Sequence, residues 1–181
     1  MAVIITVSEP RTYEDYSALV DKFQKRMKEE NHEKHEAMSN EREMGVAGVR
    51  RFVAKNQAGM VVGWMTLKTQ DADLKIEGIC TDPVKENSSG ASKALITAAI
   101  NCSLSVGKGG VVTLTNMSNG TGDSLYQYMG FRYIDENKMR LNIDWGNTEM
   151  WGVNDLGPKT TEQVWRGEKS DKLRIAQIFR K

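Results

Sequence analysis

One polar stretch of the chain has the residue types that could hold a phosphate. It comprises Asn87, Ser88, Ser89, Gly90, Ala91, Ser92 and Lys93. The stretch follows an apolar segment and leads into helix-forming sequence, and the N–H groups at the start of a helix attract anions. Small side chains let an anion approach these groups closely. Turn and cap residues of the same types also make ordinary connections, so composition alone leaves both readings open.

Histidines and cysteines are the residues to consider as metal ligands. His32 and His35 are one residue short of the His-Glu-x-x-His spacing, so their rings would not share a helix face, and no third ligand is evident. Cys80 and Cys102 form no Cys-x-x-Cys pair and lie in apolar stretches, which favours buried free thiols. The sequence predicts no metal site.

Hydrophobic patterning predicts the elements that position these residues. Strands are expected at residues 2–8, 74–83 and 111–115, with two more within 50–68 around a turn at 56–59. A closing hairpin is expected in 131–144. A first helix is expected to begin at Tyr13 with Thr12 as its cap, and the charged segment after Lys25 is expected to form a second, more exposed helix or a mobile helix–loop that ends before Gly45. Two further helices are expected at 91–106 and 124–129. In the 91–106 helix Leu95, Ala98, Ala99 and Cys102 form a narrow apolar face. This order predicts an α+β fold with a mixed sheet.

Two motifs in this element order resemble the GNAT superfamily of N-acetyltransferases. In NGTGDSLYQYMGF, residues 119–131, Asn119, Tyr126, Gly130 and Phe131 match the family pattern Asn-x-x-Ala-x-x-x-Tyr-x-x-x-Gly-Phe. The 87–92 loop corresponds to the family's Arg/Gln-x-x-Gly-x-Gly/Ala pattern. Gly90 matches it, whereas Asn87 and Ser92 differ from it.

The resemblance implies a mixed, mostly antiparallel central sheet flanked by helices and a binding site for acetyl-CoA. The loop from Asn87 to Lys93 would hold the pyrophosphate. The strand before it would open away from its neighbour and offer backbone groups of Ile79, Cys80 and Thr81 to pantetheine, which Asn119 would also contact.

The resemblance also implies catalytic roles for two residues. The Tyr126 hydroxyl would lie near the thioester sulfur, where a phenol can protonate the departing thiolate. Glu77 would act as general base or position a water, because an ammonium has no nucleophilic lone pair. A solvent-facing strand residue is an equal reading for Glu77, and Gly130 and Phe131 have structural roles in either case.

Composition sets the wider expectations. The chain has 181 residues, a net charge of +1 and 39% hydrophobic residues, typical of one globular domain. We expect an acetyltransferase domain in 1–144 and an extension in 145–181 that packs on the domain or on a second subunit, with a homodimer possible. The N-terminus lacks a signal pattern and no stretch is long enough to span a membrane, which favours the cytoplasm.

The acceptor and the activity itself remain open. From Pro158 onward seven lysines and arginines stand against three acidic residues, which could steer a polyanion such as tRNA or form a solvated face. The acceptor would be an amine of a small molecule, a protein or an aminoacyl-tRNA. One hypothesis is acetyl transfer by direct attack in a ternary complex, and the other is a weak or inactive binding or regulatory module on the same fold.

Overall fold

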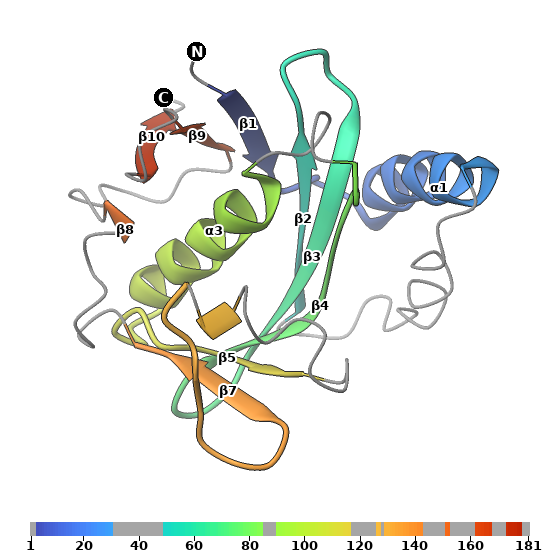
Figure 1. Cartoon of the computed structure of the whole chain (residues 1–181). Helices are drawn as coiled ribbons and strands as arrows, with labels where there is room; N and C mark the ends of the chain where they lie inside the picture. The colour runs from blue at the N-terminus through green and yellow to red at the C-terminus, as the bar shows by residue number, and fades with distance from the viewer. Residues whose placement is uncertain are drawn as a thin grey trace.

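The computed structural model describes residues 3–30, 49–84, 90–116, 126–127, 129–142, 151–152, 162–167 and 173–178. Within these ranges the chain forms one mixed sheet with a helix against each face (Figure 1). The predicted α+β class is confirmed. From residue 31 on, the second, charged helix or helix–loop expected before Gly45 lies outside the described residues, and so do three of the six residues of the 124–129 helix.

The strands are joined in the order β6-β7-β5-β4-β3-β2-β1-β9-β10-β8. Their bounds are β1 Val3–Ser8, β2 Val49–Lys55, β3 Val61–Thr69, β4 Leu74–Thr81, β5 Val112–Thr115, β6 Arg132–Tyr133, β7 Lys138–Leu141, β8 Trp151–Gly152, β9 Glu162–Gly167 and β10 Leu173–Ile178. Among these strands, neighbours pair antiparallel except β4 with β5 and β8 with β10. The β4–α3–β5 crossover accounts for the first parallel pair, because parallel strands need a long connection.

Helix α1, Tyr13–Glu29, covers β2 and β3 on one face, which we call the α1 face. Thr12 caps the helix as predicted, its Oγ1 accepting a hydrogen bond from the Asp15 backbone N–H at 3.1 Å. Tyr16, Phe23 and Met27 are buried against Val53, Val61 and Trp64 of the sheet.

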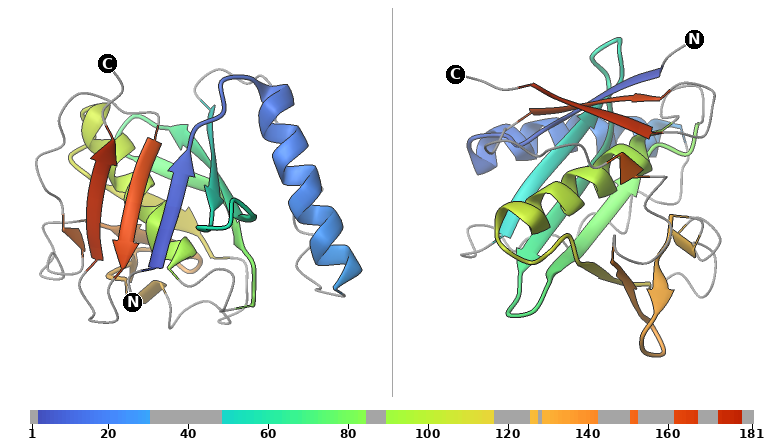
Figure 2. Two further views of the ribbon diagram at one scale, coloured as in Figure 1. Left: turned by 90° about the horizontal axis from the view of Figure 1, so that it is seen from above. Right: turned by 90° about the vertical axis from the view of Figure 1, so that its left-hand side faces the viewer.

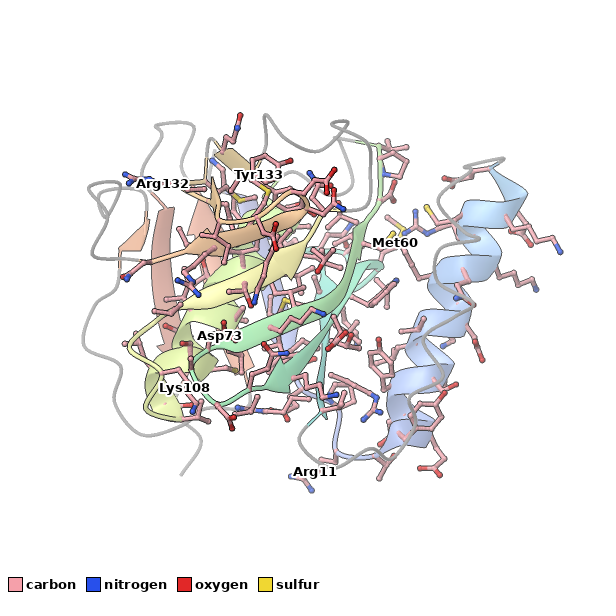
Figure 3. The ribbon with its side chains drawn as sticks, turned by 90° about the horizontal axis from the view of Figure 1, so that it is seen from below. Arg11, Met60, Asp73, Lys108, Arg132 and Tyr133 are labelled. Carbon is pink, nitrogen blue, oxygen red and sulfur yellow. The ribbon has the colours of Figure 1, made fainter. Side chains whose placement is uncertain are left out.

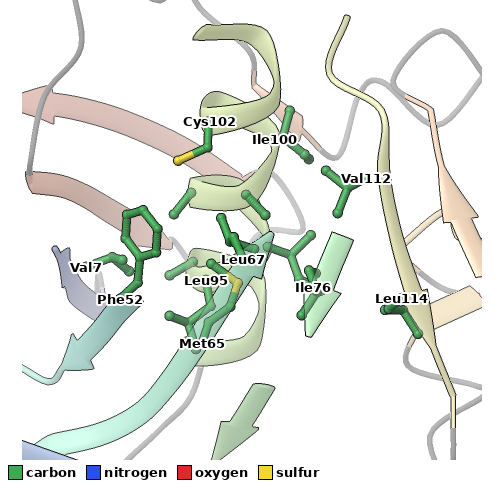
Figure 4. Packing of buried hydrophobic residues seen from close by; sticks show 14 of the residues in the cluster. Val7, Phe52, Met65, Leu67, Ile76, Leu95, Ile100, Cys102, Val112 and Leu114 are labelled. Carbon is green, nitrogen blue, oxygen red and sulfur yellow. The ribbon is translucent and has the colours of Figure 1, made fainter. Parts of the chain in front are cut away.

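Helix α3, Ala91–Ser105, packs on the other face of the sheet, which we call the α3 face. The helix and this face of the sheet together form the main core (Figure 4). This core includes Leu67, Ile76 and Leu114, which come from three neighbouring strands. The expected narrow apolar face was wrong: every residue from Ala94 to Ser103 is buried. Small residues such as Ala98 and Ala99 let surrounding backbone pack closely, so the whole circumference of the helix is used.

Two described strands of the C-terminal segment join the main sheet. β9 pairs antiparallel with β1 from Val3↔Gly167 to Ser8↔Glu162, and β10 pairs with β9, so both extend the sheet of the same chain (Figure 2). Isolated strands are marginal in water, and pairing with β1 supplies their hydrogen bonds. The division into 1–144 and 145–181 stays a prediction.

Neither described helix combines the length and the apolarity that crossing a membrane requires. The cytoplasmic location and the homodimer stay predictions.

Candidate functional site

Strand β4 separates from β5 halfway along its length. Its register with β5 covers only Leu74, Lys75 and Ile76, whereas its register with β3 continues to Thr81. Figure 1 shows β5 running away from the upper part of β4. In the described part of the chain, the segment from Glu77 to Thr81 therefore does not pair with β5. The predicted separation of this strand, at Ile79, Cys80 and Thr81, is confirmed as geometry.

A β-bulge marks the start of this separation. Thr66 of β3 faces Gly78 and Leu67 faces Ile76, so Glu77 is an extra residue of β4. A bulge bends its strand and redirects the side chains around it. The strand therefore changes direction at the position that the sequence singled out as a candidate base.

The Glu77 carboxylate is accessible and lies on the α1 face. Ile76 packs into the core beneath α3, and Lys75 and Glu77, on either side of it, point to the opposite face. Glu77 Oε2 lies 3.7 Å from Lys75 Nζ, and the glutamate side chain is 30% exposed. This placement suits a solvent-linked base and equally suits a surface ion pair, so both readings remain.

The start of α3 is tied directly to the end of β4. Thr81 Oγ1 and Ser92 Oγ share a hydrogen bond at 3.2 Å. Gly90, the N-cap residue, has φ +88° and makes no side-chain cap bond. This left-handed conformation favours glycine strongly, which explains the residue type at the best-matched position of the loop motif. Ala91 is buried, and Ser92 and Lys93 are partly exposed in the first turn.

Gly63 of β3 lets these elements come together. A Cβ at this position would lie 2.9 Å from the Cys80 carbonyl oxygen and 3.2 Å from both Leu95 Cδ1 and Thr81 Cγ2. Sequence reasoning did not select Gly63, although an isolated glycine inside an apolar strand is a signal of close backbone approach.

Sequence reasoning also missed an ion pair that anchors the chain after β4. Arg26 of α1 donates through Nη1 to Asp82 Oδ2 and through Nη2 to the Val61 carbonyl at 2.5 Å. Asp82 Oδ1 accepts from the Val84 backbone N–H at 2.9 Å, and the Asp82 side chain is fully buried. The turn signal of Asp82 before Pro83 was visible, but its partner lies 56 positions earlier. The pair joins α1 to the segment that leads into the 87–93 loop.

The spacing of Tyr126, Gly130 and Phe131 corresponds to a helix end of the Schellman type. Phe131 N–H donates to the Tyr126 carbonyl and Gly130 N–H to the Gln127 carbonyl, both at 3.0 Å. Gly130 has φ +99°, as this motif requires. The Tyr126 and Phe131 rings meet edge to face with centroids 5.8 Å apart. Phe131 is buried, so the motif holds the Tyr126 backbone and ring in place.

Tyr126 packs against the main core together with Ile79 of β4. Burial raises the pKa of the Tyr126 phenol above its ordinary value, and the nearby Cys80 thiol raises this pKa further. The phenol therefore keeps its proton at neutral pH, as a proton donor must. Of the site residues predicted from the sequence and described here, Tyr126 lies close to the end of β4, at Ile79 to Thr81. The Thr81–Ser92 hydrogen bond links this end of β4 to the Gly90–Lys93 turn.

Several predicted residues lie outside the described part of the chain. They are Asn87, Ser88, Ser89 and Asn119 of the two motifs, and His32 and His35. Within the described ranges no group of three or more His, Cys, Asp or Glu side chains could hold a metal ion. Cys80 and Cys102 are free thiols, as predicted; Cys102 is buried, whereas Cys80 is only partly buried, so the expected burial was wrong for Cys80.

Comparison with known proteins gives structural matches. No protein-family model matches the chain, and no curated protein matches it. A GNAT-family acetyltransferase from Staphylococcus aureus Mu50 is 16% identical, covering 77% of this chain and 99% of that one, with a TM-score of 0.55.

Two further matches have lower TM-scores. Nourseothricin acetyltransferase is 21% identical over 52% of this chain, which spans 65% of that protein's length, with a TM-score of 0.45. AtaTR bound with acetyl-CoA is 18% identical over 52% of this chain and 67% of that one, with a TM-score of 0.42.

The Staphylococcus aureus structure matches most of this chain, and the sheet is mixed and mostly antiparallel with a parallel β4–β5 pair that separates after Ile76. The resemblance drawn from the sequence motifs is confirmed at the level of the fold: the protein has the acyl-CoA N-acyltransferase fold of the GNAT superfamily.

Proposed function

We propose that the chain is an N-acetyltransferase that moves an acetyl group from acetyl-CoA to a primary amine by direct attack in a ternary complex. The observation that carries this proposal is the separation of β4 from β5 beside Tyr126. At one end of β4 it brings together a strand segment outside the β4–β5 ladder, a protonated phenol and a helix N-terminus. A purely structural sheet has no need of this combination.

The residues at this end of β4 fit acetyl-CoA. The backbone of Ile79 to Thr81 would pair with the amides of pantetheine, and the turn from Asn87 to Lys93 would hold the pyrophosphate. The Ser92 side chain bonds to Thr81 Oγ1. Because this bond directs the Ser92 side chain toward β4, the serine would leave room for the pyrophosphate. A serine could then replace the Gly or Ala of the family pattern. Asn119 would contact pantetheine.

Bound acetyl-CoA supplies an activated thioester whose thiolate leaves when an amine attacks the carbonyl carbon. Tyr126 would donate its proton to that thiolate and recover one from solvent. Glu77, on the α1 face, would accept the proton that the attacking amine loses, directly or through a water. Holding the amine beside the thioester would supply much of the acceleration.

A transfer screen tests the proposal. Labelled acetyl-CoA is incubated with small amines, proteins and aminoacyl-tRNA, and we expect label in at least one amine class. With the acceptor so found, Tyr126→Phe should lower kcat by about 100-fold or more, the usual contribution of a general acid, and leave acetyl-CoA affinity nearly unchanged. Tyr133→Phe is the matched control, since Tyr133 is an exposed phenol on β6.

Glu77→Gln separates the two readings of that residue. A base or water-positioning role predicts a loss of kcat of about 100-fold, whereas a surface ion pair predicts a rate like that of the control Glu136→Gln, an exposed turn residue. No label transfer to any class, together with acetyl-CoA binding, would instead indicate the binding module.

A further inference from the structure

The end of β4 has a sheet neighbour on one side only in the described part of the chain. Up to Ile76 the strand pairs with both β3 and β5, whereas from Gly78 to Thr81 it pairs with β3 alone. Ladder hydrogen bonds on a single side leave the position of a strand end dependent on that one neighbour and on side-chain contacts. The geometry of this segment therefore depends on what holds the end of β4.

One arginine bridges the end of β4 and the start of β3. Arg26, in the last turn of α1, donates through Nη1 to Asp82 Oδ2 and through Nη2 to the Val61 carbonyl at 2.5 Å. Asp82 directly follows β4, and Val61 is the first residue of β3. The Asp82 backbone N–H also donates to the Val62 carbonyl at 2.8 Å, which continues the contact between the two strands beyond Thr81.

The surroundings of the bridge hold the guanidinium in one orientation. The Asp82 side chain is fully buried and that of Arg26 is 20% exposed. The guanidinium also lies over the Phe23 ring, 5.5 Å from its centroid. A buried carboxylate depends strongly on its cation, and two acceptors and a ring restrict where a planar guanidinium can lie. The bridge is therefore a fixed contact between α1 and two strand ends.

The position of α1 in the fold agrees with this contact. Figure 3 shows the last turns of α1 on the side of the sheet where Met60 precedes β3, and far from Asp73, which precedes β4. Arg26 thus contacts the end of β4 and leaves its beginning to other contacts.

The neighbouring residue connects the same strand end to the second helix. Thr81 Oγ1 shares a hydrogen bond of 3.2 Å with Ser92 Oγ in the first turn of α3. The helices α1 and α3 lie on opposite faces of the sheet, so both hold the end of β4, one through Asp82 and the other through Thr81. Asp82 Oδ1 also accepts from the Val84 N–H at 2.9 Å, which fixes the direction of the chain after the strand. A displacement of Asp82 would therefore move Thr81 and the backbone before it.

We propose that Arg26 and Asp82 are positioning residues for acetyl-CoA binding. Their bridge keeps the backbone of Ile79 to Thr81 at the place where the amides of pantetheine would pair with it. Both side chains would act through the end of β4, without touching the cofactor themselves. The inference rests on the proposed function and adds two residues to the site that the sequence motifs did not select.

The two acceptors of the bridge explain why an arginine is needed. A planar guanidinium reaches the Asp82 carboxylate and the Val61 carbonyl at the same time, whereas the lysine ammonium is a compact charge on a flexible stem. Arg26→Lys therefore keeps a positive charge for Asp82 and loses the fixed link to β3. This substitution separates the positioning of the strand end from the neutralisation of a buried carboxylate.

Isothermal titration calorimetry with acetyl-CoA tests the proposal without any acceptor amine. Arg26→Lys should weaken acetyl-CoA binding by about 10-fold, the contribution of about one backbone hydrogen bond to pantetheine. Asp82→Asn keeps an oxygen for the Val84 N–H and removes the charge, so it should weaken binding similarly and tests the proposal if the lysine variant does not fold. With an acceptor in hand, the KM for acetyl-CoA should rise by about 10-fold while kcat stays within about 2-fold.

Arg50→Lys is the matched control. Arg50 donates through Nε and Nη2 to the Glu9 carboxylate at 3.0 and 2.5 Å, and its guanidinium lies 5.3 Å from the centroid of the Phe52 ring. The register places Arg50 opposite Leu67 of β3, which faces the first half of β4. This variant breaks a similar ion pair away from the end of β4 and should leave acetyl-CoA affinity unchanged.

Loss of stability alone does not imitate the expected result. Each variant is titrated where urea unfolding shows it to be almost fully folded, because the apparent dissociation constant rises only as the competent fraction falls. Equal affinities of the parent protein, Arg26→Lys and Asp82→Asn would overturn the proposal and leave the proposed function in place. Equal losses of affinity in Arg26→Lys and Arg50→Lys would do the same. A parent protein that binds no acetyl-CoA at millimolar concentration would overturn both.

Discussion

Gly63→Ala tests whether close packing of β3, β4 and α3 shapes the proposed cofactor site. The new Cβ would lie 2.9 Å from the Cys80 carbonyl oxygen, whereas ordinary contacts begin at 3.4 Å. Because the crowded atom belongs to the backbone, relief requires the end of β4 to move by about 0.5 Å, and Leu95 and Thr81 are crowded as well.

The expected loss of stability is modest. Overpacking a core costs about 1–3 kcal/mol, and replacing glycine returns about 0.4–1 kcal/mol by restricting the unfolded chain. The net loss should be about 1–2 kcal/mol, which corresponds to a fall in Tm of roughly 2–8 °C at this chain length. Urea unfolding and thermal melting measure it. Acetyl-CoA affinity should fall with it, because Ile79 to Thr81 and the start of α3 move.

Gly59→Ala is the matched control. Gly59 has φ +80°, and a Cβ on this residue would meet no other atom within 4 Å, so alanine strains only the β2–β3 turn, by about 1–2 kcal/mol. It should lower stability comparably and leave acetyl-CoA affinity unchanged. The reasoning is refuted if Gly63→Ala is as stable as the parent protein, or if both variants lose the same affinity.

Two further predictions concern buried groups. Arg26→Met should lower the free energy of unfolding, measured in urea, by about 3 kcal/mol, because it leaves the buried Asp82 carboxylate without its cation. The double variant with Asp82→Asn should lose less stability than the sum of the two single variants. Strictly additive losses would contradict an interaction between the two residues. Burial raises the pKa of the Cys102 thiol to about 12 from 9.0, with Arg50 opposing the shift. The unfolded chain therefore loses this proton first as pH rises, so stability should fall between about pH 9 and 12 by up to about 4 kcal/mol. Cys102→Ala should flatten that pH dependence, and an unchanged profile would contradict the assignment.

Local sequence rules predicted the parts of the fold that depend on neighbouring residues. The Tyr126, Gly130 and Phe131 spacing was recognisable because a helix end needs a left-handed residue at a fixed distance from the last turn. The cap at Thr12 and the strand alternation rest on similarly short-range geometry.

Long-range features escaped prediction because their partners are distant in the chain. The Glu77 bulge depends on how β3 and β4 align, which no local pattern determines. The Arg26–Asp82 pair spans 56 positions. The C-terminal strands needed β1 as a partner, and their own sequence gave no regular alternation by which to find them.

The central claim is that the end of β4, with Tyr126 and the start of α3, holds acetyl-CoA. Isothermal titration calorimetry of the full chain with acetyl-CoA tests it most directly. The account predicts one binding site with a micromolar dissociation constant, and a clear loss of affinity in Gly63→Ala. The absence of any heat of binding at millimolar acetyl-CoA would contradict it.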